Sequence, residues 1–409
     1  MEFGPIMSAM RRNKVGAILI AVQMAITLAI LCNALFIIEQ RVALSKRPTG
    51  ADEANVFIMD NQWVGNPPDA SARLQGDLAA LRSLPGVQDA FATNSFPMSG
   101  GGSTEGVRLH PDQKDSTALA ALYFGDEHAI AGFGLKLVAG RNFNPGDVVD
   151  KLGYTDLRGP TGIIITRVLA DKLFPGGNAV GQSIYGVAPT GQTPIIGIVD
   201  RLQVPWISAG GWGSKFNDSS IIEPFNFISV YPYHYIVHTQ PGQMSSVLQA
   251  APKKLFDISH ARVIGKTQTM SAARSDAYKD DKGLVVILAV VCASLLAVTS
   301  FGIVGLTSYW VAQRRRQIGI RRALGATRNA IIQYFQTENL LIAGAGAAIG
   351  VALALSLNLW MVNAFAMQRL NTSYALIGAI VVLLLGQAAV LWPAFKAASI
   401  PPALATRAA

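Results

Sequence analysis

Cysteine and charged residues are scarce in this chain of 409 residues. The two cysteines, Cys32 and Cys292, both fall inside long apolar runs, so the polar part of the sequence has none. Its fold is therefore expected to rest on an apolar core rather than on disulfides. There is no CxxC or HExxH pattern and no cluster of histidines, which argues against a metal site.

Two catalytic signatures are also missing. No G-x-x-x-x-G-K-[ST] phosphate loop occurs, and the segment 211–215 resembles one only superficially because its spacing is wrong. No G-x-S-x-G nucleophile elbow occurs either. We therefore expect no ATP site, no cofactor and no catalytic residue on this chain. The many carboxylates of the polar region cannot be paired from the sequence, so catalysis is unsupported but not excluded.

Four long runs contain no Asp, Glu, Lys or Arg. They cover Val15–Ile38, Gly283–Gln313, Asn339–Gln368 and Leu370–Phe395. Each exceeds the ~20 apolar residues that cross a bilayer. They predict four membrane spans at 15–38, 283–313, 339–365 and 374–395, with a short external loop at 366–373. The first run is too long for a signal peptide and no cleavage site follows it. Since no Asp, Glu, Lys, Arg or His lies in the runs, no ion relay is visible and a secondary transporter is disfavoured.

The distribution of charge predicts the orientation. If both termini are cytoplasmic, eleven basic and two acidic residues lie on the cytoplasmic side, which then carries the whole formal net charge of +9. This agrees with the positive-inside rule. Membrane topology thus explains the basic pI, and no nucleic-acid-binding pattern accompanies it. The segment 39–282 is then extracytoplasmic, and 396–409 is a cytoplasmic tail. Residues 1–14 form either an amphipathic helix on the inner surface or the first turns of the first span.

The polar region reads as alternating strands and helices. The predicted strands are 55–61, 87–96, 161–166, 193–199, 227–238 and 261–266, and the predicted helices are 69–84, 167–173 and 244–257. Parts at about 41–102 and 227–267 are expected to form β-α-β units that flank an insertion at about 103–226. The polar segment from Lys266 to Asp281 is expected to form a helical stalk, with 268–282 leading into the second span.

The Gly- and Ser-rich loop 205–224 also contains aromatic residues. Trp206, Trp212 and Phe216 either fold back on their own domain or contact a partner or substrate, because aromatic residues are enriched at binding surfaces.

The loop 314–338 is strongly basic. Such charge is expected at a span end, and contact with anionic lipid heads is a second simple explanation. Topology does not explain the order Ile318-Gly-Ile-Arg-Arg-Ala-Leu-Gly-Ala. Ile320, Ala323 and Leu324 predict an apolar face on a short helix that Gly325 ends, with a new helix starting at Asn329. A short helix protruding between two spans suits mechanical contact with a soluble motor.

This loop resembles the signature R-R-R-E-I-G-I-R-R-A-L-G-A of the MacB/FtsX-like family of ABC transporter permeases, with Gln317 in place of the usual Glu. The exterior segments at 140–143 and 166–184, the acidic Glu338 and the tail at 393–403 resemble the MacB-like branch as well. The resemblance implies that the loop couples to an ATPase. The positions concerned are Arg314, Arg315, Arg316, Ile318, Gly319, Ile320, Arg321, Arg322, Ala323, Leu324, Gly325, Ala326, Thr327, Arg328 and Glu338.

The resemblance implies an α-helical membrane protein with four transmembrane helices and a large α+β extracytoplasmic domain, which has porter-like and inserted subdomains like the MacB periplasmic core. The expected function is that of an inner-membrane permease subunit of a mechanotransmission ABC transporter. The expected partners are an ATPase dimer carrying ATP and Mg, a second permease subunit, membrane lipid, and a periplasmic adaptor with an outer-membrane channel. The substrate would be a peptide, antibiotic, toxin or lipid-like molecule.

Other functions stay open at this point. An FtsX-like signalling scaffold that activates a cell-wall hydrolase, and a lipoprotein-extracting permease, share this architecture. A surface enzyme anchored by four spans is a further alternative. Within the third span, Gly346 and Gly350 form a small-xxx-small pattern that allows close helix packing.

Overall fold

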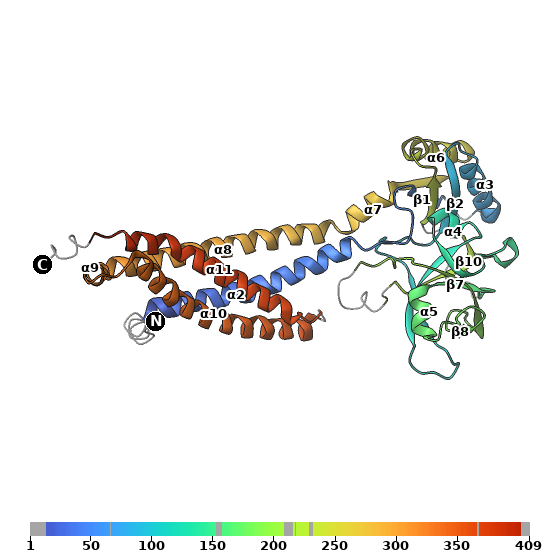
Figure 1. Cartoon of the computed structure of the whole chain (residues 1–409). Coiled ribbons are helices and arrows are strands. Elements are labelled where there is room, and N and C mark those ends of the chain that lie inside the picture. The colour runs from blue at the N-terminus through green and yellow to red at the C-terminus, as the bar shows by residue number, and fades with distance from the viewer. Residues whose placement is uncertain are drawn as a thin grey trace. The chain divides into compact units, whose positions relative to one another are not determined.

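The computed structural model describes residues 14–65, 67–152, 158–207, 216, 218–228, 232–365 and 368–401. The chain divides into two compact units, one formed by residues 44–280 and the other by 1–43 together with 281–409. The first unit is an α+β domain and the second is helical (Figure 1).

The α+β unit contains a four-stranded antiparallel sheet built from both ends of the polar region. Its strands are β1 (Val56–Trp63), β2 (Val87–Thr93), β11 (Tyr233–Thr239) and β12 (Arg262–Thr269), in the order β12-β1-β11-β2. Helices α3 (Ala70–Arg82) and α6 (Met244–Ile258) connect β1 to β2 and β11 to β12. This is the split β-α-β arrangement. The apolar side chains of both helices pack with those of the sheet in one core.

A buried ion pair fixes α3 to this sheet. The Arg262 guanidinium donates from Nη1 and Nη2 to the two carboxylate oxygens of Asp77, both at 2.8 Å. Both side chains are fully buried. The hydroxyl of Tyr235 also donates to Asp77, at 2.6 Å. A buried pair is retained without a large penalty only when such additional hydrogen bonds satisfy it.

The second sheet lies between these two halves in the sequence. It follows the order β3-β4-β10-β7-β9-β5, with β6 paired to β10 and β8 to β9. The strands are β3 (Ser103–Val107), β4 (Ala118–Gly125), β5 (Leu137–Gly140), β6 (Val149–Leu152), β7 (Ile163–Thr166), β8 (Ser183–Tyr185), β9 (Gln192–Val199) and β10 (Ser220–Ile228). Helix α4 (Ala129–Phe133) packs on β2 and β11, and α5 (Arg167–Leu173) packs on β4, β7 and β9.

Two expectations for the polar region are wrong. The single strand at 227–238 is two strands, because Phe227 and Ile228 end β10 and β11 begins at Tyr233. Likewise Ser220–Pro224, assigned to a loop, is buried β-strand paired with β4. The aromatic and β-branched residues of β10 and β11 carry the same strand signal, so the sequence alone did not separate the two strands.

The predicted helical stalk begins later than expected. Residues 266–269 belong to β12, whose pairing with β1 runs to Thr269. The Thr269 side chain then caps α7 (Met270–Ala277) by accepting from the Ala272 backbone N–H. Tyr278 separates α7 from α8 (Lys279–Gln313). Residues 266–269 are therefore held as a strand by their pairing with β1, although the composition of the segment favours a helix.

The helical unit contains four helices long and apolar enough to span a membrane among the described residues. These are α2 (Lys14–Ser45), α8, α10 (Arg328–Phe365) and α11 (Thr372–Ala398), and the short α9 (Arg315–Ala323) lies between α8 and α10. Each predicted span lies within one of these helices. The predicted helix at 1–14 lies outside the described residues apart from Lys14, which begins α2.

Polar bonds and close backbone packing join these helices. Thr27 of α2 bonds Thr299 of α8 at 2.8 Å between their hydroxyls, and Asn33 Nδ2 donates to the Ala354 carbonyl of α10 at 3.1 Å. Gly346 and Gly350 of α10 face the backbone of α2. A Cβ on Gly350 would lie 2.9 Å from the Ala25 carbonyl oxygen. The glycine pair therefore lies at a helix–helix contact, as such a pattern favours.

Candidate functional site

Helix α9 is a nine-residue helix with defined ends. At its C-terminus the Gly325 N–H donates to Arg322 O and the Ala326 N–H donates to Arg321 O, while Gly325 adopts φ +94°. This is a Schellman stop, which requires a residue that tolerates positive φ. Thr327 then caps the next helix, because its hydroxyl accepts from the Ala330 N–H. Gly325 thus ends the helix as expected, and α10 begins at Arg328, one residue before the predicted start.

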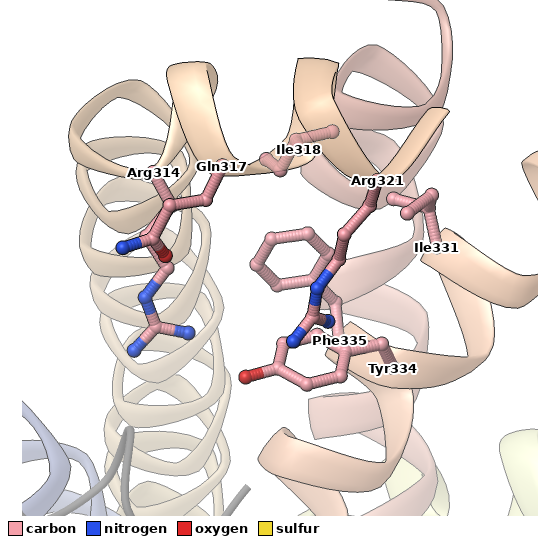
Figure 2. Close-up of a pocket in the computed structure, with 7 residues that line it drawn as sticks. All are labelled: Arg314, Gln317, Ile318, Arg321, Ile331, Tyr334 and Phe335. Atoms are coloured by element: carbon pink, nitrogen blue, oxygen red, sulfur yellow. The ribbon is translucent and has the colours of Figure 1, made fainter. Parts of the chain in front are cut away.

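One side of α9 packs on its own chain. Ile318 and Gly319 are buried, and Ile318 shares an apolar cluster with Ile331 and Phe335 of α10. Figure 2 shows Ile318, Ile331 and Phe335 around a small hollow, with Arg321 reaching over the ring of Tyr334. The volume of this hollow is about 30 Å³. The guanidinium carbon of Arg321 lies 5.0 Å from that ring's centroid, a cation–π contact.

Two arginines join α9 and its approach to the other helices. Arg314 Nη1 donates to both carboxylate oxygens of Glu338 in α10, at 3.0 and 2.8 Å, and the Glu338 side chain is only 3% exposed. Arg322 Nη1 donates to the carbonyl of Ala398, the last residue of α11, at 2.5 Å, and to that of Ile400 beyond the helix, at 3.3 Å. A force on α9 would therefore reach both α10 and α11 through charged hydrogen bonds.

The other side of α9 faces outward. Leu324 is 83% exposed and Ile320 is 45% exposed, and Ala323 is exposed beside them. Arg315 and Arg316 are exposed as well. The predicted apolar face of Ile320, Ala323 and Leu324 is therefore exposed. The contact of α9 with α10 is made by Ile318. We call Arg315, Arg316, Ile320, Ala323 and Leu324 the α9 outer face.

The sequence predicted which residues of the loop form the site but not which residues they contact. It selected Glu338 by resemblance, and the structure gives it Arg314 as a partner. Glu338 is the one acidic residue between Gly283 and Pro401, so its pairing with a nearby arginine could have been predicted from the sequence. Tyr334, which Arg321 stacks on, was missed because one tyrosine near a span end carries no specific pattern.

Two of the three aromatic candidates of the α+β unit, Trp206 and Phe216, fold onto their own domain. Phe216 is completely buried, and its ring lies 5.2 Å from that of Trp206, between centroids. Both pack with the second apolar cluster of the unit. The partner contact predicted for Phe216 is therefore wrong, because a fully buried ring has no surface to offer. Trp212 lies outside the described residues.

Within the described ranges, no group of three or more His, Cys, Asp or Glu side chains is placed to hold a metal ion. Three arginines of the loop are held in place: Arg314 by one carboxylate, Arg322 by backbone carbonyls and Arg321 by an aromatic ring. Such a site can transmit force and bind a partner.

Four apolar helices joined to a mixed α+β domain define a polytopic membrane protein with a large domain outside the lipid. Two family models match the chain: the MacB-like periplasmic core domain over residues 16–264 and the FtsX-like permease C-terminal domain over residues 289–402. The chain belongs to the MacB/FtsX-like family of ABC transporter permeases. Both the resemblance and the fold class expected from the sequence are confirmed.

Several curated relatives have the name macrolide export ATP-binding/permease protein MacB. The protein of Brucella abortus is 31% identical over 49% of this chain and 31% of its own length. Those of Chromobacterium violaceum and Neisseria meningitidis serogroup A are 26% and 24% identical, over 54% and 67% of this chain and 32% and 40% of their own lengths. The chain thus spans about a third of the length of these relatives.

Solved structures of similar domains are more distant. The periplasmic region of MacB from Actinobacillus actinomycetemcomitans is 15% identical, with a TM-score of 0.34 over 57% of this chain and 97% of that one. The extracellular domain of the transporter YknZ from Gram-positive bacteria is 17% identical, with a TM-score of 0.32 over 51% of this chain and all of that one. The family assignment rests on the family models rather than on these scores.

Proposed function

We propose that this chain is the permease subunit of a mechanotransmission ABC transporter, driven by an ATPase on another chain that docks on the α9 outer face. The observation that carries the proposal is the two-sided character of α9. Its inner side is bonded to α10 and α11, whereas its outer face presents arginines and large apolar side chains to solvent. Exposed apolar groups rimmed by charge are typical of a protein contact.

The charge distribution supports an orientation with both termini and α9 in the cytoplasm. Every basic residue of the helical unit between Arg314 and Lys396, apart from Arg369, then faces the ATPase side. In this orientation the α+β unit is extracytoplasmic, and the membrane is the inner membrane. Anionic lipid at the cytoplasmic surface reinforces the same arrangement.

Motion would pass along α2 and α8 to the α+β unit. In the helical unit, Arg41 of α2 pairs with Asp281 of α8 at 2.5 Å. In the α+β unit, Arg274 of α7 binds both carboxylate oxygens of Glu53, at 2.6 and 2.7 Å, and the carbonyls of Ser45 and Arg47, each at 2.8 Å. These bonds hold the outgoing and returning segments together, so that the two helices would move as one.

The cargo and further partners extend the same proposal. A peptide, antibiotic, toxin or lipid-like molecule would be handled outside the membrane, with a second permease subunit and, where present, an adaptor and outer-membrane channel. Macrolides are the first class to test because the relatives are named for their export. The match to the MacB-like core over 16–264 favours transport over the hydrolase-activating and lipoprotein-extracting alternatives.

A substitution on the α9 outer face tests the docking step. Leu324→Asp places a charge where an apolar contact is expected and disturbs no contact of the chain itself, since Leu324 is almost fully exposed. We expect it to abolish permease-stimulated ATPase activity with the permease still inserted, while Leu324→Met keeps that activity. Normal stimulation in Leu324→Asp would contradict the docking proposal.

Arg321→Glu with Arg322→Glu, the obvious change from the sequence, is a poorer test. Arg322 binds the Ala398 carbonyl and Arg321 stacks on Tyr334. Loss of activity in that double variant would not separate a lost partner from a disturbed loop.

A further inference from the structure

A second feature lies beside the start of α9, between the ends of α8 and α11. The ends of α8 and α11 and the first turn of α9 enclose an open groove of about 350 Å³. Its walls include Ser308 and Val311 of α8, Arg315 of α9, and Pro393, Lys396 and Ile400 in and after α11. We call it the α8–α11 groove. Figure 1 shows α9 and the labelled helices α8 and α11 that contribute to it.

Aromatic residues place this groove at the depth of the lipid headgroups. Tyr309 of α8 and Trp392 of α11 are 60% and 61% exposed, and each lies a few residues before the basic residues that line the groove. Exposed Tyr and Trp near span ends collect at the membrane–water interface. Lys396 lies over the Trp392 ring, 5.3 Å from its centroid, so the cation is held at that level.

The groove has uncompensated positive charge. Neither Arg315 nor Lys396 takes part in an ion pair within the described residues. Glu338, the one carboxylate between Gly283 and Pro401, is already bound by Arg314. The C-termini of α8 and α11 add partial negative charge, equivalent to about half a unit each. Two full positive charges exceed this, so the groove favours an anion.

Ser308 adds a polar group that lacks a partner. Ser294 and Ser300 on the same helix donate to the carbonyls four residues earlier, each at 2.8 Å. The Ser308 hydroxyl is buried and has no hydrogen-bond partner. Since a buried hydroxyl without a bond is costly, a ligand oxygen in the groove would stabilise it.

We propose that the α8–α11 groove binds the headgroup of an anionic phospholipid. Arg315 and Lys396 contact the phosphate, Ser308 donates to a phosphate or ester oxygen, and an acyl chain follows Val311 and Pro393 into the bilayer. Basic pockets between helices on the cytoplasmic side are suited to such headgroups. A bound lipid ties the first turn of α9 to α11, so lipid composition tunes the position of the α9 outer face. This inference rests on the membrane orientation proposed above but not on the docking of an ATPase.

The test measures lipid binding by the full chain in detergent micelles. Phosphatidylglycerol, phosphatidylcholine, glycerol 1-phosphate and inorganic phosphate are titrated separately, with native mass spectrometry as the readout. At about 1 kcal/mol for each basic residue, Arg315→Gln with Lys396→Gln should weaken phosphatidylglycerol binding about thirtyfold. The control is Arg316→Gln, which removes an exposed arginine that does not line the groove.

Each outcome decides between lipid and other ligands. Selective phosphatidylglycerol binding that only the double variant loses supports the proposal. Equal binding of phosphatidylcholine, or equal loss in Arg316→Gln, would overturn it. Glycerol 1-phosphate or phosphate binding as tightly as the lipid would make this a site for a soluble anion and also overturn it. Should the double variant fail to fold, the unmodified chain purified from membranes must retain anionic rather than zwitterionic lipid.

Discussion

The ion pair between Arg314 and Glu338 offers the sharpest test of how the loop is held. Their side chains are 12% and 3% exposed, so neither charge is well hydrated when its partner is removed. Breaking a buried pair by removing one member costs about 3–5 kcal/mol, mostly because the other charge stays buried. Arg314→Met should fall in the upper part of this range, since Glu338 has almost no access to water. Glu338→Met should cost less, because the long side chain of Arg314 can turn towards solvent.

The double variant Arg314→Met with Glu338→Met separates the interaction between the two residues from the contacts that each makes with the rest of the chain. With both residues changed to Met, no buried charge remains, and we expect stability near that of the unmodified chain. Chemical unfolding in detergent, followed by far-UV circular dichroism, gives the four free energies of a double-mutant cycle. Because the double variant should cost little, the coupling energy should approach the sum of the two single costs. Additive single costs, or a larger cost for Glu338→Met than for Arg314→Met, would refute this account of the loop.

Three further predictions follow from the packing. Gly350→Ala should destabilise the chain by about 1–3 kcal/mol in thermal or chemical unfolding, because its Cβ meets the Ala25 backbone, whereas Gly344→Ala, with open space around it, should not. Asp77→Ala should lower the free energy of unfolding by about 3–5 kcal/mol, because it leaves Arg262 buried without a partner. Asp200→Ala should lower it by less than about 1 kcal/mol, because the pair of Asp200 with Arg167 is exposed. Burial raises the pKa of Glu223 to about 8, against the opposing effect of Lys151, so stability should fall as pH rises from about 4.5 to 8. Glu223→Gln should flatten that slope, and an unchanged slope would show that Glu223 is not its source.

The sign of the Glu223 effect follows from proton binding. Between pH 4.5 and 8 the unfolded chain has lost the Glu223 proton while the folded chain still holds it. The folded state therefore binds more protons, and raising the pH favours unfolding. Below pH 4.5 both states are protonated, so this group adds no further slope there.

The membrane spans were predictable because the length of an uncharged apolar run is enough to identify a span. A run of some twenty uncharged apolar residues has few alternatives, and all four spans lie in the helices of the structure. Helix α5 was predicted at its observed bounds, and α3 nearly so, because turn residues flank both. The spacing of Ile320 and Leu324 predicted an apolar face on α9, and both side chains are exposed, whereas the inner contact of Ile318 with α10 was not predicted.

Contacts between distant segments were not predictable. Asp77 and Arg262 are separated by most of the polar region, and nothing local marks either as buried. The sequence left open whether Phe216 folds back on its own domain or contacts a partner, and tertiary packing buries it. Strands β3, β4, β5, β6 and β8 were missed because short strands in a mixed sheet are specified by their neighbours more than by their own residues.

The central claim is that an ATPase docks on the α9 outer face, and crosslinking at Leu324 tests it most directly. A photoreactive amino acid at Leu324 is activated in native membranes, and captured proteins are identified by mass spectrometry. The same residue at Leu384, exposed in the middle of α11, serves as the control. We predict capture of a P-loop ATPase at Leu324 and none at Leu384. Repeated failure at Leu324, where a control transporter of the same family captures its own ATPase, would contradict the account.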